Sequence, residues 1–280
     1  MAFRFWQIGL HIQQHEALAV AVVRGASGWS LQRWWRVPLA ECTFVDGHLR
    51  EPEQLVNALL PWRRSLPHRH HIYLSFPASR TLQKHFPCPE MALREREQTA
   101  WLTGAMAREL DMPPDALRFD YREDTLTPAF NVTAAQSKEV ATLLTLAQKL
   151  KMQVTAITPD ACALQRFIPY LLAHQQCLAW RDEEQWLWAT RYAWGRKPLQ
   201  EAACVDSLAA TRYAWGRKPL QEAACVDSLA ATLSIAPESL TVCGAGGFEP
   251  WCAVAIRQPP VPPEGHTFAI ALGLAMGAPR

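Results

Sequence analysis

Residues 5–37, FWQIGLHIQQHEALAVAVVRGASGWSLQRWWRV, decide the fold class of this chain. Two segments rich in β-branched and aromatic residues, 5–10 and 17–24, lie on either side of the polar residues 11–16. This pattern predicts a strand, a turn and a second strand. Residues 29–37 predict a third antiparallel strand in the same way. We therefore expect the chain to begin with a sheet.

The residues after this sheet predict a helix and a return to the sheet. Pro52 is suited to a helix start, and Leu55, Val56 and Leu59 follow at helical spacing, with the end expected near Pro61. Residues 72–76 have the composition of a buried strand. Three strands, a helix and another strand predict a mixed sheet with helical cover, which is an α/β fold.

A second unit follows residue 76. Residues 81–86 predict a strand, residues 93–110 a helix, and residues 117–121 and 130–134 two further strands. Ser137 is expected to cap the next helix, whose apolar residues lie on one side. Residues 154–157 predict a short strand, and Thr158, Pro159 and Asp160 predict the start of a helix after it.

The last third of the chain contains a tandem duplication, because residues 189–209 recur without substitution as residues 210–230. Two copies do not make a repeat fold, in which at least about three units bury one another. The 280-residue chain less one 21-residue copy leaves a frame of 259 residues. Residues 176–179 and 185–194 predict a hairpin that turns at 181–184, and residues 220–233 a helix. We expect residues 199–216 to be the surplus and to be exposed.

The composition indicates a folded chain with a core, since 49% of the residues are hydrophobic and 19% are charged. No apolar run approaches the roughly 20 residues of a membrane helix, and no signal peptide is seen, so we expect a cytoplasmic protein. The cysteine spacing indicates neither zinc nor a disulfide framework. His68, His70 and His71 lie in a polar stretch in which a solvated loop is favoured over a metal site. A net charge of +2 argues against a broad nucleic-acid surface.

A glycine turn is the strongest candidate for a ligand loop. Gly244, Gly246 and Gly247 follow a predicted strand, where backbone amides can approach an anion closely. The lysine of a P-loop is missing, and a plain tight turn explains the glycines equally well. The chain contains no nucleophile elbow and no metalloprotease helix.

Longer segments of the chain resemble the PilM family, the actin-like, FtsA-related cytoplasmic proteins of type IV pilus machines. The similarity covers most of residues 3–175 and returns at 240–277, and it is strongest to members linked to competence-like DNA uptake and use of external DNA as a nutrient. It is carried by four segments: FPASRTLQKHFPCPEMALREREQTAW (76–101), FDYRE (119–123), NVTAAQSKEVATLLTLAQKLKMQVTAITPDACALQRF (131–167) and FAIALGLAMG (268–277).

The resemblance implies an actin-like, FtsA/PilM-type fold in three parts. Residues 1–76 would form a first-lobe subdomain that the C-terminal helix 266–280 completes. Residues 77–175 would form the inserted subdomain of this family. Residues 176–258, with the duplicated block 189–230, would form a reduced second lobe.

The phosphate loops depart from the family pattern Gly-x-Asp-x-Gly-Ser. Here the first loop reads GLHIQQ from Gly9, with His11 at the acidic position, and the second reads WRDEE (180–184) without glycine. Phosphate binding needs open backbone amides and a Mg²⁺ ligand. We therefore expect no ATP turnover, no metal and no catalytic residue, with Gly9, Gly244, Gly246 and Gly247 as a vestigial nucleotide site.

The resemblance also implies a partner, the cytosolic tail of a PilN- or HofN-type inner-membrane protein, which would hold the chain at the inner membrane beside other pilus components. Capture of an extended peptide by strand edges and apolar pockets suits such a role. We expect the groove near six residues, each of which could equally be core: Phe76, Pro77, Arg80, Leu82, Glu97 and Trp101.

Two rival functions stay open at the level of sequence. An active actin-like ATPase would need residues 244–247 to share a cleft with Gly9. A DNA-binding component of uptake would need Arg33, Arg36, Arg63 and Arg64 to form one continuous face.

Overall fold

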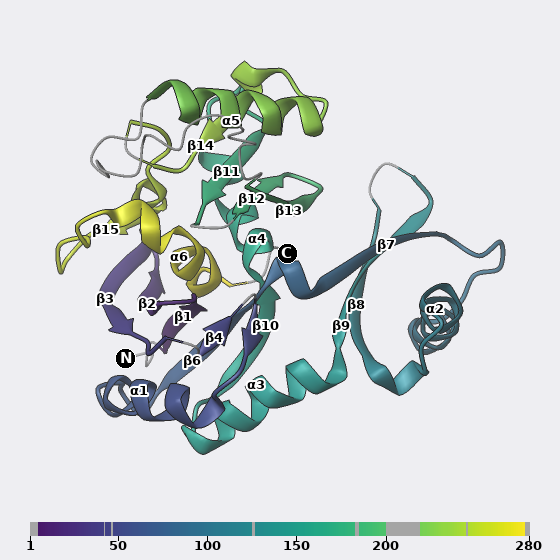
Figure 1. Ribbon diagram of the computed structural model, residues 1–280, viewed down its shortest axis with the longest axis horizontal. Coiled ribbons are helices and arrows are strands. Elements are labelled where there is room, and N and C mark those ends of the chain that lie inside the picture. Colours follow the sequence, from purple (N-terminus) through teal and green to yellow (C-terminus); the bar gives the residue numbers. More distant parts are fainter. Residues whose placement is uncertain are drawn as a thin grey trace, which may run out of the picture.

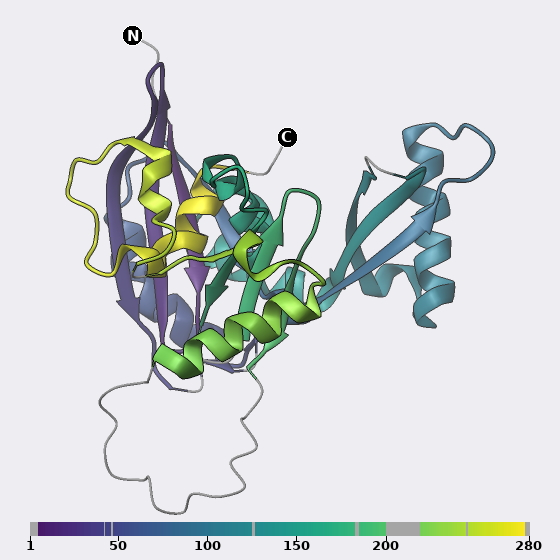
Figure 2. The same cartoon turned by 90° about the horizontal axis from the view of Figure 1, so that it is seen from above.

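The computed structural model describes residues 5–41, 43–45, 47–124, 127–182, 185–199, 219–244 and 246–277. Within the helix Pro219–Thr232, side chains are described from residue 226 onward. It contains a large sheet at one end, a smaller sheet beside it and a three-stranded unit that projects to one side (Figures 1 and 2). Within these residues no helix is long and apolar enough to cross a membrane.

The central sheet has six strands in the order β10-β6-β1-β2-β3-β15. Its strands are β1 (Trp6–Ile12), β2 (Glu16–Gly25), β3 (Gly28–Pro38), β6 (His70–Phe76), β10 (Val154–Pro159) and β15 (Val254–Ile256). The first three are antiparallel, whereas β6 and β10 run parallel to β1. The carboxyl ends of β1, β6 and β10 therefore meet at one edge of the sheet.

Both faces of the central sheet are buried, as the run of apolar residues in β2 requires. Ala17, Ala19 and Ala21 pack toward α1 (Pro52–Arg64) and α3 (Ser137–Lys149). The alternate residues Leu18, Val20 and Val22 pack toward α6 (Ala269–Ala275). The small alanines on one face and the small residues of α6 on the other allow the helices to approach the sheet closely.

The three-stranded unit has the strand order β7-β9-β8. Its strands are β7 (Thr81–Pro87), β8 (Leu117–Glu123) and β9 (Ala129–Gln136), and α2 (Glu95–Leu110) covers one face. Leu102 and Met106 of α2 are buried against Phe130 and Val132 of β9. The opposite face is polar, and Gln83 donates from it to the carbonyl of Trp194 at 3.1 Å.

The second-lobe sheet has four strands in the order β13-β12-β11-β14. They are β11 (Cys177–Arg181), β12 (Gln185–Thr190), β13 (Trp194–Pro198) and β14 (Leu240–Val242), and α5 (Pro219–Thr232) packs on one face. Lys197 at the end of β13 donates to the carbonyl oxygen and Oγ of Ser228 and to Oγ1 of Thr232. The end of β13 therefore lies beside the second half of α5.

Shorter elements connect these parts. The pair β4 (Phe44–Val45) and β5 (His48–Leu49) precedes α1, and α4 (Asp160–Ala163) follows β10 directly. The 3₁₀ segments are Ala78–Arg80, Pro114–Ala116, Leu164–Tyr170, Pro237–Ser239, Pro250–Ala253 and Gly265–Phe268. The segment Leu164–Tyr170 packs against both α6 and the second-lobe sheet, and so joins the two large sheets.

The opening hairpin, the third strand and the strands of the inserted unit lie where the sequence predicts them. The predicted end of α1 near Pro61 is wrong, because the helix continues through Pro61 to Arg64 and buries Trp62 under the sheet. The predicted cap at Ser137 is also wrong. Gln136 precedes the first residue of α3, while Ser137 Oγ donates to the carbonyl of Asp115 at 2.7 Å.

The predicted three-part division stays a prediction. Strand pairing places β10 in the central sheet beside β6, although its residues fall in the stretch 77–175. The expected surplus, residues 199–216, lies outside the described residues except for residue 199. The predicted hairpin strand 185–194 contains β12 and reaches the first residue of β13, and the predicted helix 220–233 corresponds to α5.

Candidate functional site: the polar cluster between the two large sheets

Polar side chains gather where the parallel strands of the central sheet end. Ser75 near the end of β6 accepts a hydrogen bond from the backbone N–H of Ile12 at 3.2 Å. Asp160 follows the last residue of β10, and His11 lies near the end of β1. Ligands of α/β proteins bind outside the carboxyl ends of such strands. This edge is therefore the candidate functional site.

His11 is buried at the site, with 4% of its surface exposed. Its ring meets the ring of Trp180 edge to face, with centroids 5.7 Å apart, and its Nδ1 lies 3.3 Å from Nε2 of Gln13. Burial lowers the pKa of His11 to about 3, because a charged imidazole would be desolvated there. His11 is therefore neutral at physiological pH and joins the first hairpin to β11 of the second-lobe sheet.

Asp160 is the buried acid of the site. Its Oδ1 accepts the N–H groups of Ala78 at 2.9 Å and Ala161 at 2.7 Å. Burial raises the pKa of this carboxyl to about 7, and the charge of Asp182 raises it further, whereas Arg196 and both hydrogen bonds lower it. Asp160 thus connects Ala78 to the start of α4 through hydrogen bonds, and its pKa depends on charged residues of the second-lobe sheet.

The second hairpin of the site is organised by Asp182. Its Oδ1 accepts the N–H of Gln185 at 2.7 Å, and its Oδ2 lies 3.3 Å from Nε2 of the same residue. These contacts close the turn between β11 and β12 through a side chain, without a glycine. Glu183 and Glu184 lie outside the described residues.

Gly9 has a packing role. A Cβ added to Gly9 would lie 1.9 Å from the carbonyl oxygen of Ala271 and 2.6 Å from the nitrogen of Ala275. The backbone of α6 therefore rests directly on β1 at this position. This contact explains the glycine without a phosphate.

The other predicted glycines form a tight turn after β14. The N–H of Gly247 donates to the carbonyl of Gly244 at 3.0 Å, and a Cβ on Gly247 would meet the carbonyl of Val242 at 2.1 Å. Gly246 has a φ of 79° and open space around it. The turn geometry thus accounts for Gly246 and Gly247. Their role toward a nucleotide stays a prediction.

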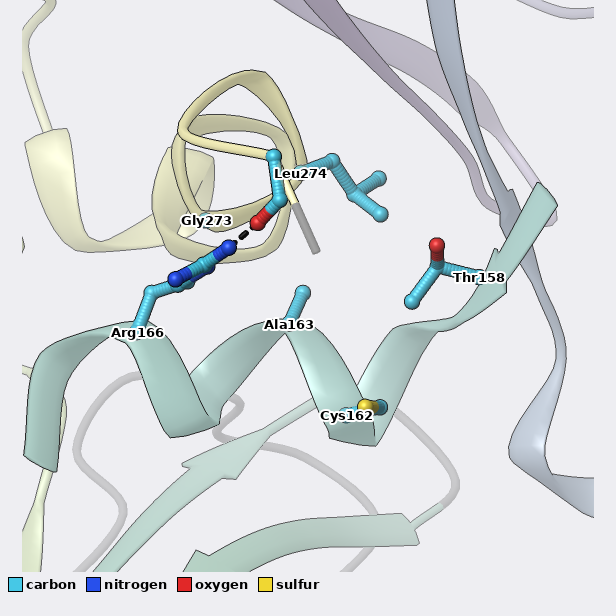
Figure 3. A pocket seen from close by; sticks show the side chains of 7 residues that line it. Thr158, Cys162, Ala163, Arg166, Gly273 and Leu274 are labelled. Carbon is cyan, nitrogen blue, oxygen red and sulfur yellow. Dashed lines mark hydrogen bonds between the residues drawn. The ribbon is translucent and has the colours of Figure 1, made fainter. Parts of the chain in front are cut away.

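A small cavity lies near the site between α4 and α6. Its volume is about 10 Å³, which is room for about one water molecule. Figure 3 shows Arg166 pointing toward α6, and its Nε donates to the carbonyl of Gly277 just after that helix. The lining residues are Thr158, Cys162, Ala163, Arg166, Gly273, Leu274 and Gly277. A nucleotide does not fit into this space.

The chemistry open to the site is that of one buried carboxyl and one neutral imidazole. Within the described ranges no group of three histidine, cysteine or acidic side chains could hold a metal ion. A carboxyl with a raised pKa is a feature of many active sites. Here Asp160 accepts hydrogen bonds from two backbone N–H groups, and this structural role explains why the carboxyl is buried.

The predicted partner residues fall in two places. Phe76 is buried at the end of β6, Pro77 follows it, and Arg80 binds Oε1 of Glu139 through Nε at 3.0 Å and Nη2 at 2.7 Å. Leu82 at the start of β7 is 41% exposed. These four residues form one continuous stretch along the root of the three-stranded unit.

The other two predicted partner residues belong to α2. Trp101 packs between Phe86 and Phe130 in the core of the three-stranded unit. Glu97 accepts the N–H of Arg94 at 2.8 Å and so stabilises the helix start. A groove that joins them to residues 76–82 stays a prediction.

The arginines of the DNA-binding alternative do not form one face. Arg33 lies opposite Ala21 and Arg36 opposite Leu18 on β2, and these partners belong to opposite faces of the sheet. Arg63 donates to the carbonyls of Leu150 and Lys151 at the end of α3. The geometry that this alternative requires is therefore absent.

Sequence reasoning missed Asp160 and Glu139 as residues of interest. The sequence predicts Asp160 only as part of a helix start, although an acid directly after a predicted strand is a signal that could have found it. Glu139 lies 3.2 Å from Nδ1 of His48 as well as beside Arg80. No local pattern predicts this cluster, because its members come from three separate elements.

Comparison with known proteins agrees with this architecture. No family model matches the chain. It is 63% identical over 277 residues to the DNA utilization protein HofM of Escherichia coli (strain K12), covering 99% of each chain. Among solved structures, the PilM-PilN type IV pilus biogenesis complex matches with a TM-score of 0.68 and 17% identity over 96% of this chain and 97% of the other.

A further match is the cytoplasmic domain of EpsL, an inner membrane component of the type II secretion system of Vibrio cholerae, with a TM-score of 0.48 and 13% identity over 68% of this chain and 70% of the other. The similarity to PilM confirms the α/β fold of PilM type that the sequence predicts. On its identity over nearly the whole of both chains, this protein belongs to the family of the DNA utilization protein HofM.

Proposed function

We propose that this protein is a non-catalytic cytoplasmic scaffold of a type IV pilus-like DNA-uptake machine, required for use of extracellular DNA as a nutrient. It binds the cytosolic tail of a PilN- or HofN-type inner-membrane protein and is held at the inner membrane through that partner. The relative at 63% identity is a DNA utilization protein, and the solved structure of the same fold is a complex of PilM with PilN. These two findings support the partner class.

The geometry of the candidate site supports the non-catalytic part of the proposal. Gly9 is covered by α6, and His11 is a buried, neutral side chain. A phosphate loop needs open amides, and Mg²⁺ prefers carboxylate and water oxygens. An uncharged imidazole packed on Trp180 supplies neither.

The observation that carries the partner site is the free edge of β7. This strand is the margin of the three-stranded sheet, and within the described residues its pairing partner is β9 alone. A free strand edge offers backbone donors and acceptors to an extended peptide. Leu82 is an exposed apolar side chain on this strand, two residues after Arg80.

Isothermal titration with a synthetic PilN-type cytosolic tail tests this site. Leu82→Glu should weaken binding about tenfold or more, because the tail would meet a charge in place of an apolar contact. Met91→Glu is the matched control, since Met91 is 70% exposed and lies in the connection between β7 and α2. An equal loss of affinity in both variants, or no loss in either, would show that the tail does not bind at β7.

The non-catalytic part has its own test. Purified protein should show no Mg²⁺-dependent ATP hydrolysis above the level of a heat-denatured sample. Hydrolysis that disappears on Gly246→Val would refute the scaffold proposal. Gly246 suits this test because a Cβ there would meet nothing within 4 Å, although its positive φ disfavours a side chain.

A further inference from the structure

Beyond its short pairing with β15, the outer edge of β3 is a further free strand edge, on the opposite margin of the molecule from β7 (Figure 1). Its neighbour β15 pairs only with Trp29 and Ser30. A register shift at Ala21 and Val22 leaves Gln32 unpaired with β2, so the regular edge runs over residues 33–37. Within the described residues no strand pairs with this stretch on its outer side.

Such an edge has the backbone groups that a peptide strand needs. In an antiparallel pair, alternate residues direct their N–H and C=O groups away from the neighbouring strand. Five regular residues span about 16 Å at about 3.3 Å each. This length suits a short extended segment.

Aromatic side chains border the edge on both faces of the sheet. On the face toward α1, the ring of Trp35 meets Trp62 edge to face with centroids 6.2 Å apart, and both indole N–H groups are buried without an acceptor. On the other face, Trp34 donates to the carbonyl of Pro260 at 3.0 Å and packs on Phe268. The walls beside the edge are therefore held in place before any peptide arrives.

Two arginines lie beside the edge, and only one of them has carboxylates close to it. Arg36 lies 3.4 Å from Glu16 and 3.8 Å from Glu264. Arg33 is exposed and stacks on the ring of Trp35, 5.4 Å from its centroid, and no carboxylate of the described residues pairs with it. A stacked guanidinium is ordered in advance and leaves its N–H edge open to a carboxylate.

We propose that residues 33–37 of β3 bind an extended acidic peptide from another protein as an added strand, with a carboxylate of the peptide opposite Arg33. The positive charge selects against a second copy of this chain. Two β3 edges paired over residues 33–37 about a two-fold axis would gather Arg33 and Arg36 of both copies along one seam, and such a concentration of like charge is destabilising.

Fluorescence anisotropy with a labelled ten-residue peptide of alternating glutamate and valine tests the proposal. The peptide should bind, and the same peptide with lysine in place of glutamate should not. Arg33→Glu should weaken binding about tenfold or more, since the pair becomes repulsive. Arg96→Glu reverses an exposed charge on α2 and should leave the affinity unchanged. Hydrogen exchange should slow at residues 33–37 when the acidic peptide is bound.

Several results would overturn the proposal. These are absence of binding, equal binding of both peptides, equal effects of the two substitutions, or slowed exchange at β7 with none at β3. Binding of a single-stranded oligonucleotide that Arg33→Glu abolishes would assign the edge to nucleic acid. A dimer in sedimentation that Arg33→Glu strengthens would assign it to a second copy.

Discussion

The carboxyl of Asp160 should make the protein less stable as the pH rises. Its pKa is raised by burial from an ordinary 3.8 to about 7 in the folded chain. Between these two values the folded state binds the proton more tightly than the unfolded state does, so stability is lost as pH increases through this window. One pKa unit corresponds to about 1.4 kcal/mol, and the loss between pH 5 and pH 8 is about 3 kcal/mol.

His11 contributes in the opposite direction. Its pKa is lowered by burial from 6.5 to about 3, so between these values the unfolded chain binds more protons and stability rises with pH. The two buried groups therefore offset each other between about pH 4 and 6.5. The contribution of Asp160 is seen only as a difference between the protein and a variant that lacks the carboxyl.

Asp160→Asn isolates this difference. The amide oxygen can accept the same N–H groups of Ala78 and Ala161, but it does not titrate. Urea unfolding at pH 5 and pH 8 should show the variant gaining about 3 kcal/mol relative to the parent over this interval. Asp115→Asn removes an exposed carboxyl as a control. A difference between variant and parent that is equal at the two pH values would refute the reasoning.

Two further predictions concern glycine packing and the duplicated block. Gly9→Ala should destabilise the protein by about 1–3 kcal/mol or more, because the added Cβ would overlap the backbone of α6. Gly104→Ala in α2 is the control, because a Cβ has space there, and it should stabilise the protein by up to about 1 kcal/mol. Thermal unfolding of the two variants measures both effects. Lys197→Ala should cost about 1 kcal/mol in the full chain, through lost hydrogen bonds to α5, and nothing in a chain without residues 210–230. That shorter chain lacks Ser228, and its helix sequence follows β13 at once, so the equivalent serine, Ser207, would lie about 15 Å from Lys197 along the helix. An equal cost in both chains would contradict this geometry.

The strands of the central sheet other than β15 were predictable because each carries its own local signal. The apolar run of β2 and the polar residues before it specify a buried hairpin without reference to the rest of the chain. The end of α1 was not predictable, since the burial of Trp62 under the sheet outweighs the cost of Pro61 inside the helix. Such a tertiary contact leaves no trace in local spacing.

The candidate site was predictable only in part. The replacement of an acid by His11 could be read from the sequence through resemblance, but its burial against Trp180 could not. The sequence predicts Gly9 only as part of a vestigial nucleotide site, because its contact with Ala271 comes from a helix more than two hundred residues away in the chain. The pKa of Asp160 depends on burial and on charges from the second lobe, which only the folded chain brings together.

The position of α6 over the first hairpin affects the order in which the protein can fold during translation. Leu18, Val20 and Val22 are fully buried in the folded chain, partly by α6, which is synthesised more than two hundred residues after β2. At about 5–20 residues per second, the ribosome needs on the order of ten seconds or more to pass from β3 to α6. During this interval the apolar face formed by Leu18, Val20 and Val22 is not yet covered by α6. The synthesis of α6 therefore determines how long the first hairpin stays exposed to chaperones and to aggregation.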